Sequence, residues 1–181
     1  MLAGCISGHD RVSHEELPKA WKSALQHIEK KAPDVSGSYQ DLGEYTHEYS
    51  SNSDHVSRGR LARLLFEEIK PVITAGQVRL TQRVPDRLEI AALQDGQVMA
   101  SKTVAIEADP VTGAVSLRRE SGFDAGGNLA AAGVQSTTII LFKGSDGSLY
   151  LHLKSFTDGV VAVVIPTKTS AENWGRWAPA Q

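Results

Sequence analysis

The sequence predicts an α+β fold that is mainly β, in which an antiparallel meander forms a curved sheet or partial barrel. Beyond Gly76, apolar and polar residues alternate with a period of two, and pairs typical of hairpin turns separate the alternating runs. Before Gly76, two segments instead carry apolar residues at helical spacing, which predicts two amphipathic helices in the N-terminal third. The second half lacks the helical patterns that parallel crossovers require, so its strands are expected to be antiparallel.

The first helix is predicted to begin at Leu17 and to end before Pro33. Its apolar stripe, which includes Trp21, is expected to pack on a sheet rather than to lie on a membrane surface. A second helix is predicted from Ser57, a suitable N-cap, through Ile69. Its three arginines are expected to form a solvated face rather than a site for anionic lipid or phosphate.

Seven strands are expected after Gly76, following a first strand at residues 35–39. They are residues 78–81, 88–91, 98–106, 114–119, 137–142, 149–153 and 160–165. The pairs with turn chemistry are Asp95-Gly96, Thr112-Gly113, Asp146-Gly147 and Asp158-Gly159. Residues 42–54 are predicted to be a long polar loop, and the glycine-rich residues 121–133 a flexible connection between strands.

Length and composition predict one soluble domain. The chain has 181 residues, of which 41% are hydrophobic and 22% charged, so residues 17–181 are expected to form a single globular unit preceded by a tether at 1–16. A net charge of -2 and a pI near 6.3 argue against nucleic-acid binding. No run of 18 apolar residues occurs, so membrane association is expected only through an anchor.

The only cysteine, Cys5, follows Leu2-Ala3-Gly4, and this segment resembles a bacterial lipobox. In that family a signal peptidase cuts before the cysteine, which then carries acyl chains. The resemblance implies a signal in the precursor, a lipid anchor on Cys5 and a domain held in the periplasm of the cell envelope. Since Ile6 and not aspartate follows the cysteine, it also implies the outer membrane. The alternative is a lone exposed thiol at a frayed terminus.

Only Met1 precedes this box, although a secretory signal needs a charged and then an apolar region. We therefore expect the sequence to start inside a longer precursor. Residues 34–39 are also similar to the opening strand of small bacterial lipoproteins, and Gly37 with Tyr39 is similar to the start of lipocalin barrels, which carry tryptophan in place of this tyrosine.

No catalytic residue, metal site or cofactor is predicted. His47, Glu48, Asp54 and His55 are close in sequence, but their spacing fits no structural zinc pattern, so a solvated loop is expected. The segment at 144–148 lacks the nucleophile-elbow pattern. His152 is expected to be an exposed strand histidine, because no carboxylate lies near it in sequence.

Trp174 and Trp177 are the candidate ligand- or partner-binding residues. Two such side chains can stack on a sugar ring, a fatty chain or a peptide, but terminal tryptophans also anchor a last strand, and we expect that structural role. The predicted function is a non-enzymatic, membrane-anchored envelope lipoprotein that binds a partner protein or supports the envelope. The alternative is a lipocalin-like carrier of a small apolar ligand, for which an enclosed apolar cavity would be the discriminating feature.

Overall fold

The structure is a computed structural model that describes residues 10–14, 17–25, 34–46, 56–66, 75–125, 131–161 and 165–181. In these ranges strands predominate, and the helices are α1 (Lys19–Leu25) and α2 (Leu61–Leu65). The strands before the second half are β1 (Asp10–His14), β2 (Gly37–Gln40), β3 (Leu42–Thr46), β4 (Val56–Arg60), β5 (Gln77–Val84) and β6 (Arg87–Gln94). The remaining strands are β7 (Gln97–Ala105), β8 (Glu107–Asp109), β9 (Ala114–Ala125), β10 (Ala131–Lys143), β11 (Leu149–Val161) and β12 (Ile165–Trp177).

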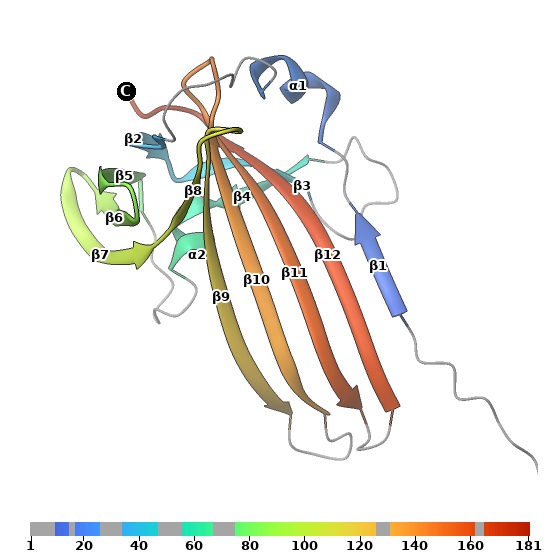
Figure 1. The fold of residues 1–181 in the computed structure, drawn as a ribbon. Helices are drawn as coiled ribbons and strands as arrows, with labels where there is room; N and C mark the ends of the chain where they lie inside the picture. The colour runs from blue at the N-terminus through green and yellow to red at the C-terminus, as the bar shows by residue number, and fades with distance from the viewer. Residues whose placement is uncertain are drawn as a thin grey trace, which may run out of the picture.

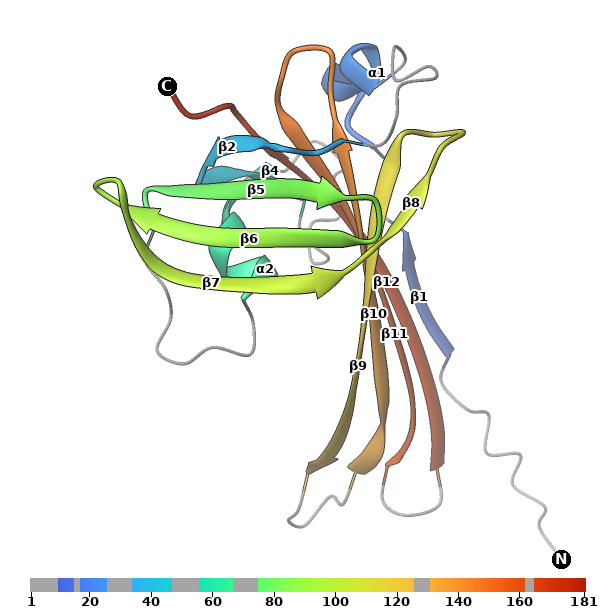
Figure 2. The ribbon, with the colours of Figure 1, turned by 60° about the vertical axis from the view of Figure 1, so that its left-hand side comes forward.

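The strands form two open sheets (Figures 1 and 2). In the larger sheet, β8 to β12 follow one another as an antiparallel meander, and β3 and β4 continue the sheet beyond β12. The smaller sheet has the order β2-β5-β6-β7 and lies against one end of the larger sheet. The predicted antiparallel meander is therefore confirmed, and neither sheet closes into a barrel.

The core lies between the two sheets and includes α2. Side chains from both sheets and from α2 are fully buried there, because alternate residues of each strand point to the same face. The largest of them are Trp177, Tyr39, Leu61, Leu65, Leu80, Leu88, Ile90, Ile139, Leu141, Leu149 and Leu151.

Strands β9 to β12 are much longer than this core requires. Each has 12 or 13 residues, and only the part nearest the β10–β11 turn packs against the smaller sheet. The remainder, which we call the arm, comprises residues 118–125, 131–138, 154–161 and 165–172. At about 3.4 Å per residue, the arm extends the sheet by about 25 Å beyond the core.

Three of the predicted hairpin turns are confirmed. Asp95 and Gly96 join β6 to β7 with φ values of 52° and 79°, the double positive φ of a type I′ turn. Gly113 and Gly147 also adopt positive φ, in the β8–β9 and β10–β11 connections. Glycine is favoured at these positions because it has no Cβ to clash.

The described part of the first predicted helix is the short helix α1, Lys19–Leu25, in which only Trp21 is buried, so the prediction of a longer amphipathic helix is not supported. In α1, Trp21 is 4% exposed and meets the ring of Tyr150 edge-on, with 6.0 Å between ring centroids. The backbone amide of Ser145 also donates to the carbonyl of Ala24. The predicted continuation over residues 26–33 lies outside the described residues. Within those residues, no helix is long and apolar enough to cross a bilayer.

The prediction of a helix starting at Ser57 is wrong. Residues 56–60 form β4, which pairs with β3, and α2 starts only at Leu61. The start of α2 is fixed by Asp41, whose carboxylate accepts from the Ala62 amide at 2.7 Å and from Arg60 at 2.8 Å. Capping rules that consider only neighbouring residues miss the start of α2, because the capping carboxylate comes from a residue that is distant in sequence.

Three further predictions about strands are corrected. Asp158 and Gly159 do not turn the chain, since β11 continues to Val161. Gly159 instead lies opposite Gly133, where a Cβ would come 2.6 Å from the Ala132 carbonyl oxygen. Most of the predicted connection at 121–133 belongs to β9 and β10, and the predicted loop at 42–54 begins with β3.

Part of the predicted tether is attached to the larger sheet. Residues 10–14 form β1, which runs parallel to residues 168–172 of β12, with Asp10 opposite Lys168 and His14 opposite Glu172. Because the two strands are parallel, the chain enters β1 from the same end of the arm at which β12 starts. Cys5 lies outside the described residues.

Candidate functional site

The candidate site lies on the face of the larger sheet that turns away from the smaller sheet. We call it the back face; it carries Tyr150, His152 and Trp174, whereas Leu149 and Leu151 point into the core. Strand register places Ile140, His152 and Trp174 side by side across β10, β11 and β12. Side chains that alternate with the core residues are thus brought together on a surface that the smaller sheet does not cover.

An aromatic patch made of Phe142, Tyr150, His152 and Trp174 dominates the back face. The His152 and Trp174 rings are stacked, 3.9 Å apart between centroids and 9° from parallel. Phe142 also stacks on Trp174, with 6.3 Å between centroids. Trp174 and Phe142 remain partly exposed, so the patch has both a packed base and an accessible aromatic surface.

His152 is held by Glu172, which lies on the neighbouring strand. The Nε2 atom of His152 is 3.0 Å from a carboxylate oxygen of Glu172, and the histidine is only 8% exposed. Burial lowers the pKa of His152, Lys154 adds to that effect, and Glu172 opposes it. The imidazole is therefore neutral at pH 7, with Nε2–H donating to the carboxylate.

The geometry around His152 favours a packing role over catalysis. Its ring lies under Trp174, and the described contact of Nε2 is the Glu172 carboxylate. Among the described residues, no group of three or more histidines, cysteines or acids is arranged to hold a metal ion. The arrangement therefore provides a rigid aromatic surface with one buried polar pair.

A network around Arg176 borders the patch. Arg176 donates to Asp146 at 2.8 Å, and the hydroxyls of Ser148 and Tyr150 donate to the same carboxylate at 2.9 and 3.1 Å. Burial acts to raise the pKa of Asp146, but these hydrogen bonds outweigh it and hold that pKa below its usual value. Arg176 and Glu44 line two open depressions, of about 320 and 520 Å³.

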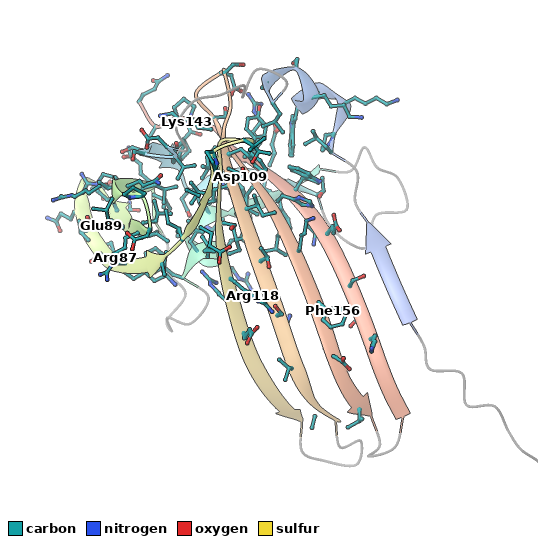
Figure 3. All side chains as sticks on the ribbon, in the orientation of Figure 1. Arg87, Glu89, Asp109, Arg118, Lys143 and Phe156 are labelled. Carbon is teal, nitrogen blue, oxygen red and sulfur yellow. The ribbon has the colours of Figure 1, made fainter. Side chains whose placement is uncertain are left out.

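The arm continues the back face beyond the patch. Figure 3 shows Phe156 on the arm, clear of the region where most side chains gather. Phe156 is 45% exposed, Val134 53% and Val160 39%, and all three lie on the back face. The described part of the arm thus presents apolar side chains to solvent.

The structure separates the two predicted tryptophans. Trp177 is fully buried, and its indole nitrogen donates to the Gly59 carbonyl at 3.3 Å, so it anchors the last strand as expected. Trp174 is the one that reaches the surface. The other candidates, Cys5 and residues 47–55 with their histidines and acids, lie outside the described residues.

Glu172 and Phe142 are the site residues that the sequence did not reveal, and the prediction of an exposed His152 is wrong. Comparison with known protein families, characterised proteins and solved structures gives no match to this chain. The site must therefore be interpreted from its own geometry.

Proposed function

We propose that this protein is a lipid-anchored protein of the bacterial cell envelope that acts by binding a partner protein and not by catalysis. The lipobox-like segment ending at Cys5 supports the anchor, with the domain in the periplasm and the acyl chains in the outer membrane. Several acyl chains on one cysteine give stable attachment, whereas one chain binds only reversibly.

The observation that carries the binding role is the aromatic patch on the back face, continued by Phe156. Rigid aromatic side chains supply much contact area at little entropic cost, and tryptophan and tyrosine are enriched at binding hot spots. Trp174 is partly exposed and is held in place by stacking on His152. A surface that is already ordered loses little conformational entropy when a partner binds.

The lipocalin-like alternative has less support. A carrier requires an enclosed apolar cavity of several hundred Å³. Here the side chains that point between the sheets, such as Leu141 and Leu151, are fully buried against their neighbours. The two depressions beside Arg176 are open and are lined in part by charged residues.

Mass spectrometry of the protein purified from its own membranes tests the anchor. We expect an N-terminal peptide that begins with acylated Cys5. Cys5→Ser should release the protein into the soluble fraction, whereas the nearby control Ser7→Ala should leave it in the membrane. An unmodified cysteine in membrane-derived protein would contradict the proposal.

Site-specific photo-crosslinking in intact cells tests the binding role. A photoreactive residue at position 156 should give a discrete crosslinked product, whereas one at position 98, which is 52% exposed on the smaller sheet, should not. Trp174→Ala should weaken the product at position 156. Equal products at both positions, or none at position 156, would count against the back face as the binding surface.

A further inference from the structure

We propose that the back face of the arm is an interface between two copies of this chain, packed face to face with their strands running in opposite directions. The inference rests on the binding role proposed above and specifies the partner. This part of the back face consists of alternate residues of β9 to β12 and is centred on Phe156, which Figure 3 labels on the arm. Sheets that pack face to face lie about 10 Å apart, so their facing side chains meet.

The charged residues of β11 and β12 form two rows across the back face, and the order of the charges is reversed between the rows. In the row nearer the core, Lys154 on β11 lies beside Glu172 on β12, so the positive charge is on β11. In the outer row, Asp158 on β11 lies beside Lys168 on β12, with 3.8 Å between their side-chain atoms, so the negative charge is on β11. Phe156 lies midway between the two rows.

A two-fold axis at the level of Phe156, lying between the sheets and perpendicular to the strands, exchanges these two rows. It places each strand over the same strand of the second copy and reverses its direction. Lys154 then faces Asp158 of the second copy. Glu172 faces Lys168 of the second copy, so opposite charges meet in both rows. A two-fold contact requires a surface that is complementary to itself, and the reversed order of the charges meets that requirement.

The same axis brings exposed apolar side chains together. The two Phe156 rings, each 45% exposed, meet at the axis, where an aromatic pair adds to the burial of apolar area. Val160 follows Phe156 by four residues, and His152 precedes it by four. Val160 of one copy, which is 39% exposed, therefore covers the stacked His152 and Trp174 of the other. The partly exposed aromatic patch thus gains an apolar neighbour from the second copy.

The size of the face suits a reversible dimer. Residues 152–160 of β11 span about 30 Å, and the four strands are together about 19 Å wide, so each copy contributes roughly 600 Å². The total of about 1,200 Å² is at the lower end of the range for stable interfaces. A second copy is favoured over an unrelated partner, because an unrelated partner would not require two rows of opposite charge order placed symmetrically about Phe156.

One like-charged contact lies at the edge of this interface. Glu120 on β9 is at the level of Phe156 and would face Glu120 of the second copy. Its carboxylate is 2.7 Å from Arg118 of its own strand, and both side chains are more than half exposed. Because the arginine offsets the charge and solvent screens it, this contact opposes the dimer only weakly.

Sedimentation velocity of the purified full-length chain tests the dimer, in a Cys5→Ser background so that no disulfide can link two copies. Between about 1 and 100 μM we expect a reversible monomer–dimer equilibrium. Lys154→Glu and Asp158→Lys should each weaken the dimer about tenfold or more, because like charges then face each other at two places. Arg87→Glu is the matched control. Arg87 is exposed on the smaller sheet, so this variant should dimerise like its parent.

An equimolar mixture of the Lys154→Glu and Asp158→Lys chains separates loss of the interface from damage to the fold. In the mixed dimer the new glutamate faces the new lysine, and the other contact is the original pair of Lys154 with Asp158. The mixture should therefore regain a dimer affinity close to that of the parent, although each variant alone is mainly monomeric. A parent chain that stays monomeric over the whole concentration range, or a mixture that binds no more tightly than its components, would overturn the proposal.

The mass of the photo-crosslinked product at position 156 distinguishes this inference from the proposed function. A product of twice the mass of the chain supports the second copy. A product of another mass, together with a monomeric purified chain, overturns the dimer and leaves the back face as a binding surface for a different protein. Absence of any product together with a monomeric chain contradicts both the dimer and the binding role.

Discussion

Trp177→Ala tests whether the end of β12 is anchored in the core. The side chain is 0% exposed, and a buried tryptophan removes about 150–250 Å² from water, which at about 25 cal/mol per Å² corresponds to about 4–6 kcal/mol. Truncation of large buried aromatics costs about 3–5 kcal/mol, so we expect a loss of about 4 kcal/mol in the free energy of unfolding. For a chain of this size, Tm should fall by about 8–16 °C.

Trp174→Ala is the matched comparison in the same strand. Its ring is partly exposed and mainly stacks on His152, so we expect a loss of about 1 kcal/mol. Equilibrium unfolding in urea, followed by far-UV circular dichroism, measures both variants without relying on tryptophan fluorescence. A loss below about 1.5 kcal/mol for Trp177→Ala, or a larger loss for Trp174→Ala, would refute the reasoning. If Trp177→Ala does not fold, Trp177→Phe should fold at reduced stability.

Three further predictions concern stability. Gly175→Ala places a Cβ against the Trp177 ring and should lower the free energy of unfolding in urea by about 1–3 kcal/mol. Gly76→Ala is the control: its Cβ would lie 3.6 Å from the nearest atom, so we expect little change in stability. Asp41→Ala removes the carboxylate that fixes the start of α2 and should lower stability by about 2 kcal/mol in the same assay. Since burial lowers the pKa of His152, stability should be lost as pH falls below about 6.5, and His152→Gln should flatten that dependence in thermal melts at successive pH values.

Local sequence chemistry was sufficient to predict much of the sheet. The pairs at Asp95-Gly96 and Asp146-Gly147 form turns, because each glycine takes a positive φ that other residues resist. Alternation in β11 correctly assigned Leu149 and Leu151 to the core. In these cases the information lies within a few residues of the element that it determines.

Pairing between residues that are distant in sequence explains the predictions that were wrong. Asp158-Gly159 has the same turn chemistry, yet it lies inside β11 because Gly159 packs closely against β10. A turn at Asp158-Gly159 would place His152 opposite Ile165, whereas the observed hairpin places it opposite Trp174. The misplaced turn therefore hid the stacking of His152 on Trp174 and the contact of His152 with Glu172.

The start of the helix at Leu61 was wrongly predicted for a related reason. Its capping carboxylate, Asp41, is twenty residues away in sequence. Contacts of this kind follow from the fold and leave no periodic signal. Cys5 and its acylation remain a prediction from the lipobox resemblance, as the described residues begin at Asp10.

The parallel pairing of β1 with β12 has a mechanical consequence. A pull on the chain before Asp10, directed out of the arm's end, acts along the axis of β1. The hydrogen bonds of the pair, from Asp10 to His14, then bear the load together in shear and are not broken one after another as in unzipping. A domain held at its N-terminus in this way resists forces along the arm more strongly than forces across it.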